Sequence, residues 1–235
     1  MDWQIAVLAL IAGYLVGALS FARIVSRRVD PTVDVTSFDS MPGGEGAGDA
    51  LQIASATTVG MRLGPGYGML TGLLDILKVL LPALALKLAY PGQPYFLLFA
   101  LAAMVGHVWP IYYRFRGGRG LSAMYGGMLA ADWLGVLATW LLAAVVGFGL
   151  RNATLIFVGG TLFYIPWVWL RWHDPAYLLY AIGVNVIFAI AMIPEAMTVW
   201  RRWRAGIRPT FAEQMEYTPM GRQLYHMAQR MRLVR

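Results

Sequence analysis

The chain alternates long apolar runs with short charged or Pro/Gly-rich breaks. A helix needs roughly 20 mostly apolar residues to cross a bilayer. Runs of that kind lie at 3–22, 67–90, 95–112, 133–150, 153–170 and 176–200. A further apolar run, 121–131, is only about half that length, so it either merges with the glycine-rich loop before it or packs as a half-helix. The pattern predicts an all-α, polytopic membrane helix bundle with about seven transmembrane helices.

Composition agrees with a membrane protein and narrows the chemistry. Apolar residues make up 59% of the chain and charged residues 13%, and the mean hydropathy is +0.58. The chain contains no cysteine, which excludes disulfides, thiolate metal sites and cysteine nucleophiles. Its three histidines lie in different segments, and neither an HExxH nor a P-loop string occurs. We therefore expect no metal and no cofactor.

The basic residues predict the orientation, because Lys and Arg collect on the cytoplasmic side of membrane spans. Three arginines lie within 23–28, just after the first run, whereas only Asp2 precedes that run, so the N-terminus should face outside. Seven crossings then put the C-terminus and its arginines in the cytoplasm. Lys87 and Arg171 are the basic residues left near the outer side. The net charge of +7 thus reflects topology and attraction to anionic membrane lipids, and no nucleic acid partner is expected.

Two parts of the chain lie outside the apolar runs. Residues 1–204 should form the transmembrane domain, which includes a polar cytoplasmic loop at about 29–55. Residues 205–235 should form a basic cytoplasmic tail. Within it, Thr210 and Glu213 have the spacing of a capping box at the start of a short surface helix.

Asp75 and Lys78 bring charge into the second long run. They are three residues apart and so share one helix face. Charges at membrane depth normally face each other or a polar cavity. The spacing is compatible with a neutralised structural pair and with part of a polar site.

The segment 106–122, GHVWPIYYRFRGGRGLS, has the strongest functional pattern. His107 ends an apolar run. A loop rich in Arg and Gly at 114–120, called the glycine loop from here on, leads directly into the next run. Glycines allow successive backbone N–H groups to turn towards an anion, and the following helix would point its positive N-terminal end at the same place. The segment predicts a phosphate-binding loop; an ordinary basic loop with turn glycines is the alternative.

This segment resembles the second motif of the bacterial membrane-integral glycerol-3-phosphate acyltransferases, which use acyl phosphate as donor. Residues 72–84, GLLDILKVLLPAL, and 14–27, YLVGALSFARIVSR, are similar to two helices of that family. The resemblance implies seven helices in the bacterial inner membrane and an active site at the cytoplasmic surface. It also implies transfer of a fatty acyl group from acyl phosphate to glycerol 3-phosphate in phospholipid biosynthesis, without a metal.

The resemblance assigns roles to particular residues. His107 and Arg119 would be catalytic, His107 by positioning a substrate through a hydrogen bond and Arg119 by stabilising developing charge. The residues expected to bind substrate are Lys78, Arg116, Gly117, Gly118 and Gly120.

The family's other two motifs are matched only in part. The first motif would fall at 50–62, ALQIASATTVGMR, where its SGN string is replaced. The polar residues left there to contact substrate are Ser55, Thr57, Thr58 and Arg62. Near the third motif, only Glu195 is a candidate match.

Two hypotheses follow from these departures. One is an acyltransferase, and the other is a catalytically silent relative that binds a phosphorylated lipid or a partner at the inner membrane surface. Convergence of Thr57, Thr58, His107 and Arg119 around one cavity would favour the enzyme. Filling of that cavity by the 29–55 loop would favour the binding protein.

Overall fold

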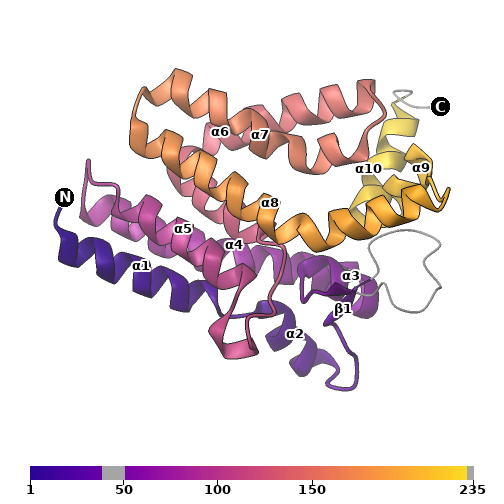
Figure 1. Ribbon diagram of the computed structural model, residues 1–235, viewed down its shortest axis with the longest axis horizontal. Helices are drawn as coiled ribbons and strands as arrows, with labels where there is room; N and C mark the ends of the chain where they lie inside the picture. Colours follow the sequence, from indigo (N-terminus) through magenta and orange to yellow (C-terminus); the bar gives the residue numbers. More distant parts are fainter. Residues whose placement is uncertain (39–50, 232–235) are drawn as a thin grey trace.

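The computed structural model describes residues 1–38 and 51–231, and its described part is almost entirely helical (Figure 1). The elements, in chain order, are α1 (Trp3–Gly17), α2 (Phe21–Val29), β1 (Ser37–Phe38), β2 (Leu51–Gln52), α3 (Ala56–Leu63), α4 (Pro65–Ala89), α5 (Tyr95–Val108), the 3₁₀ turn η1 (Ile111–Tyr113), α6 (Leu121–Gly149), α7 (Ala153–Trp172), α8 (Pro175–Arg204), α9 (Phe211–Glu216) and α10 (Pro219–Arg230). β1 and β2 pair antiparallel. The centre of the predicted 29–55 loop, 39–50, lies outside the described residues.

Within the described ranges, six helical stretches are long and apolar enough to cross a membrane, whereas the sequence predicts about seven. The difference lies in α6, where Asp132 has extended backbone angles, φ −155° and ψ 94°. This residue breaks α6 into 121–131 and 133–149, which are two separate apolar runs of the sequence. The half-length run therefore continues into the following run through one extended residue, and it does not merge with the glycine loop.

The start of α1 and the helices α9 and α10 lie at opposite ends of the molecule's long axis (Figure 1). The orientation with the N-terminus outside stays a prediction from the arginine distribution. α2, α3 and β1 lie towards the end that carries α9 and α10 (Figure 1). That end is the predicted cytoplasmic side.

Glycines set the close packing of α1 against α5. A Cβ on Gly13 would overlap the carbonyl of Phe99, and a Cβ on Gly17 would overlap the carbonyl of Ala103. The two backbones consequently approach more closely than larger residues would allow. This packing matters for the site, because the chain after α1 brings the carbonyl of Leu19 to α4.

The C-terminal tail folds back onto the membrane helices. Met215 of α9 and Tyr225 of α10 are buried in one apolar cluster with Ala153 and Ile156 of α7. The predicted capping box is confirmed: the Thr210 hydroxyl accepts from Glu213 N, and the Glu213 carboxylate accepts from Thr210 N. The hydrogen bond from the Thr210 backbone N–H, followed by one from the Thr210 hydroxyl to the same carboxylate, lowers the pKa of Glu213. The boundary between membrane domain and tail at 204/205 remains a proposal.

Candidate active site

The glycine loop is fastened to the end of α5. Gly118 N donates to the carbonyl of His107 at 3.2 Å, and Ala54 N donates to the carbonyl of Gly117 at 3.2 Å. The Arg23 guanidinium donates to the carbonyl of Arg116 at 2.7 Å, so α2 holds the start of the loop. Three segments far apart in the sequence thus meet at this loop: the start of α2, the residues before α3 and the end of α5.

Two glycines of the loop are required by close approach. A Cβ on Gly117 would overlap the carbonyl of His107, and a Cβ on Gly118 would lie 2.6 Å from Nε2 of His107. Side chains of any size at these positions would therefore push the loop away from α5. Gly120 has φ +90° and precedes the first residue of α6, so the loop runs directly into a helix N-terminus as predicted.

Asp75 and Lys78 form the predicted pair, with Nζ of Lys78 2.7 Å from Oδ1 of Asp75. Their side chains are 2% and 4% exposed. His107 joins them: its Nδ1 lies 3.0 Å from the Lys78 ammonium and 3.6 Å from Oδ1 of Asp75. The ammonium also donates to the carbonyl of Leu19 at 2.6 Å. The charged pair is thus both neutralised and part of a polar cluster behind the glycine loop.

Arg119 and Glu195 meet across the molecule. Nε of Arg119 lies 2.8 Å from Oε2 of Glu195 on α8, and both side chains are largely buried. This contact links the second-motif loop to the residue considered for the third motif. The sequence suggested each residue separately, but the pairing depends on the tertiary fold and has no local signal.

The first-motif residues are used mainly to build α3. The Ser55 hydroxyl accepts from Thr58 N and lies 2.9 Å from the Thr58 hydroxyl, which donates to the carbonyl of Ile53. Thr57 is half-buried and Arg62 is exposed at the end of α3. Within the described residues, no hydrogen bond joins Thr57 or Arg62 to the glycine loop. Among the described residues, His107 lies against the loop glycines, whereas Thr57 and Thr58 make no hydrogen bond to them. The convergence of Thr57, Thr58, His107 and Arg119 around one cavity stays a prediction.

Arg116 is exposed, and its contact with α2 is made through its backbone. A polar pocket of about 310 Å³ lies nearby, between α2 and residues 31–36. Its lining includes Arg23, Arg27 and Asp34. The Thr36 hydroxyl, followed by the Thr36 backbone N–H, lowers the pKa of the Asp34 carboxyl. In the described chain, no group of three or more His, Asp or Glu side chains is arranged to hold a metal.

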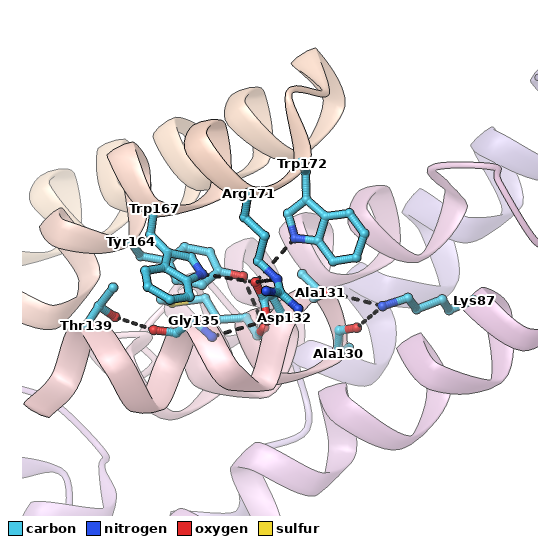
Figure 2. A network of polar contacts seen from close by, with 11 residues as sticks. Lys87, Ala130, Ala131, Asp132, Gly135, Thr139, Tyr164, Trp167, Arg171 and Trp172 are labelled. Carbon is cyan, nitrogen blue, oxygen red and sulfur yellow. Dashed lines mark hydrogen bonds and ion pairs between the residues drawn. The ribbon is translucent and has the colours of Figure 1, made fainter.

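A second polar network, around Asp132, was not expected from the sequence (Figure 2). Its Oδ2 accepts from the indole of Trp167 at 3.0 Å and of Trp172 at 3.3 Å, and it lies 2.9 Å from Nε of Arg171. Its Oδ1 accepts from Gly135 N, so Asp132 caps the second half of α6. Lys87 caps the first half by donating to the carbonyls of Ala130 and Ala131.

This network gives a structural role to the two basic residues that the sequence places near the predicted outer side. Lys87 and Arg171 are the cations on either side of the break in α6. One available signal was the lone carboxylate of Asp132 between the apolar runs 121–131 and 133–150.

Fold and site together define a polytopic membrane protein with a basic glycine loop at a helix N-terminus. The comparisons are more specific, since the profile of the glycerol-3-phosphate acyltransferase family matches residues 7–212. The chain belongs to this family.

Individual relatives agree over most of the chain. The glycerol-3-phosphate acyltransferase of Pseudomonas paraeruginosa is 33% identical over 215 residues, which cover 90% of this chain and 97% of the relative. That of Thiobacillus denitrificans is 33% identical over 192 residues, covering 79% and 90%.

Solved structures support the fold. The lysophosphatidic acid form of PlsY, an integral membrane glycerol 3-phosphate acyltransferase, superposes with a TM-score of 0.70 at 21% identity, covering 89% of this chain and 97% of that one. The glycerol 3-phosphate form of PlsY gives 0.69 at 22% identity, covering 87% and 94%.

Proposed function

We infer that this protein acylates glycerol 3-phosphate with a fatty acyl group from acyl phosphate, as an enzyme of phospholipid biosynthesis in the cell membrane. The observation that carries this inference is the family match over residues 7–212, which includes the glycine loop and Glu195. The relatives matched over most of their length are named for this activity. Acyl phosphate as the donor follows from the resemblance of residues 106–122 to the motif of the acyl-phosphate-dependent enzymes.

The reaction needs positioning and charge stabilisation. The acceptor hydroxyl attacks the acyl carbon of the mixed anhydride, an ester C–O bond forms, and the bond from that carbon to the phosphate oxygen breaks. Inorganic phosphate leaves, and in the overall balance it takes up the hydroxyl proton. No covalent intermediate on the protein is required.

The site residues fit these needs. The Gly118 N–H already donates to the His107 carbonyl, so other backbone N–H groups of the glycine loop and the N-terminus of α6 would meet the phosphate oxygens. The Arg119 guanidinium carries five donors in a planar fork, and the Glu195 carboxylate on Nε fixes its orientation. His107 sits beside the loop, where it can donate to a substrate oxygen.

Arg119→Ala tests this assignment. Loss of a preorganised charged donor costs about 2–4 kcal/mol, so kcat/KM for acyl transfer should fall roughly 30-fold to 1000-fold. The control is Arg28→Ala, which removes one exposed charge from α2. Its rate should stay within about twofold, because diffuse surface charge is screened by salt.

The silent-relative hypothesis has its own outcome in this experiment. It would be supported if the unmodified protein binds glycerol 3-phosphate in an Arg119-dependent way and yet forms no acylated product. Equal losses in both variants, removed by high salt, would contradict a phosphate site at Arg119.

A further inference from the structure

We propose that Lys78 is a positioning residue that fixes the tautomer of His107, with the imidazole proton on Nε2 and directed at the glycine loop. This assignment rests on the proposed function, because it concerns the substrate side of the same site. It also replaces the sequence-based expectation that Lys78 binds substrate.

The argument starts from the donors of Lys78. An ammonium group has three N–H donors and no acceptor. Nζ of Lys78 lies 2.6 Å from the carbonyl of Leu19, 2.7 Å from Oδ1 of Asp75 and 3.0 Å from Nδ1 of His107. Three protons therefore have three partners within the protein. Nδ1 of His107 must be the acceptor in the third bond.

The competing arrangement has a proton on Nδ1. Its acceptor would be Asp75, but Oδ1 lies 3.6 Å from Nδ1, which is beyond a normal hydrogen bond. A doubly protonated His107 would direct its Nδ1–H against the ammonium only 3.0 Å away. Both alternatives fit the distances less well than a neutral ring with its lone pair on Nδ1.

A neutral ring with a lone pair on Nδ1 has its proton on Nε2. Nε2 lies against Gly118, where a Cβ would approach it to 2.6 Å. No hydrogen bond from Nε2 is found within residues 1–38 and 51–231. The N–H is thus a donor aimed at the loop, in the position to meet an oxygen of a bound phosphate or acyl phosphate.

The surroundings keep this arrangement in place. The side chains of Asp75, Lys78 and His107 are all at least 92% buried, as their exposed fractions of 2%, 4% and 8% show. Buried charges are stable only when paired and hydrogen-bonded. The Leu19 carbonyl completes the set, which explains why the close packing of α1 and α5 matters to the site.

Nitrogen NMR on the full-length protein in lipid bilayers reads the tautomer directly. His173→Asn and His226→Gln leave His107 as the sole histidine; Asn suits His173, which has φ 50°. With ¹⁵N-histidine labelling, we expect an unprotonated Nδ1 and a protonated Nε2. Glycerol 3-phosphate should shift the Nε2 signal and leave the Nδ1 signal nearly unchanged.

Lys78→Met should remove the donor that keeps Nδ1 of His107 unprotonated, so that the tautomer with a proton on Nδ1 becomes populated. Because this change leaves the Asp75 carboxylate without its cation, Asp75→Asn/Lys78→Met is the second arm. In either variant that folds, kcat/KM should fall about 10-fold to 100-fold from lost positioning.

His107→Gln and His107→Asn separate the two nitrogens by function. The Gln amide can present a donor near the position of Nε2, whereas the shorter Asn amide reaches only the region of Nδ1. His107→Gln should therefore retain about 10-fold more activity than His107→Asn. Equal activity of the two would overturn the role of the Nε2 donor.

The proposal is overturned if the resting protein has its proton on Nδ1, or if the folded double variant shows the same tautomer as the unmodified protein. These spectra are recorded without turnover. Failure of the proposal is therefore distinguishable from failure of the proposed function, which would appear as an absence of acyl transfer by the unmodified protein.

Discussion

At the residue scale, the glycine loop owes its position to the absence of side chains. Gly117 and Gly118 allow the backbone to lie against His107, and Gly118 N donates to the carbonyl of that residue. The loop backbone and the imidazole Nε2 thereby lie close to each other, and Arg119 follows Gly118 in the chain. The sequence predicted the loop and these residues, because the pattern of Gly and Arg after an apolar run is local.

Gly118→Ala tests this packing. The new Cβ would meet Nε2 of His107 at 2.6 Å, so either the ring or the loop has to move. We expect kcat/KM to fall at least about 10-fold, because small displacements in a positioned site are costly. Gly149→Ala is the matched control, since a Cβ there meets nothing within 4 Å. Similar activities of the two variants would show that the close approach has no role in catalysis.

At the element scale, the break in α6 shows why long apolar runs alone do not give the helix count. Runs 121–131 and 133–150 are separated in the sequence by Asp132 only, which is too short for a loop. In the structure, the extended backbone at Asp132 ends one half and its carboxylate caps the next, while Lys87 satisfies the carbonyls left at the break. The two apolar runs can be recognised in the sequence. The side chains of α4 and α7 that bind the groups at the break are brought there only by the tertiary fold (Figure 2).

Asp132→Asn should destabilise the polar network at the break in α6. The amide can still accept from Gly135 N, but it loses the charge that faces Arg171 and two indole N–H groups. Hydrogen bonds to a charged partner contribute about 1.5–3 kcal/mol. We expect the free energy of unfolding in detergent to fall by about 2 kcal/mol. Asp2→Asn, at an exposed helix cap where Asn serves equally well, should change it little. An unchanged stability of Asp132→Asn would contradict a structural role for the network.

At the scale of the whole molecule, much of the architecture was predictable and most of the site contacts were not. Apolar runs, loop glycines and the Asp75–Lys78 spacing are short-range patterns, and the structure contains each of them. The pairing of Arg119 with Glu195, and of Lys78 with the carbonyl of Leu19, joins residues distant in the chain. Such pairs depend on how the helices pack, and a single sequence has no local signal for that.

The arginine distribution also predicts the topology of the whole chain. A reporter fused after Arg235 should be cytoplasmic, and one inserted at Gln93, between α4 and α5, should be outside. The physical reason is the cost of moving clustered cationic side chains across the bilayer. A C-terminus found outside would contradict the seven-crossing arrangement and would place the glycine loop and the tail on different sides.

The central claim is that this glycine-loop site transfers an acyl group from phosphate to glycerol 3-phosphate. The most direct measurement is mass spectrometry of the products formed when the purified protein, in lipid bilayers, receives both substrates. We expect 1-acylglycerol 3-phosphate and inorganic phosphate in equal amounts, and their rate of formation should fall in Arg119→Ala. Saturable binding of both substrates without any acylated product would contradict the claim and would identify the chain as a binding protein.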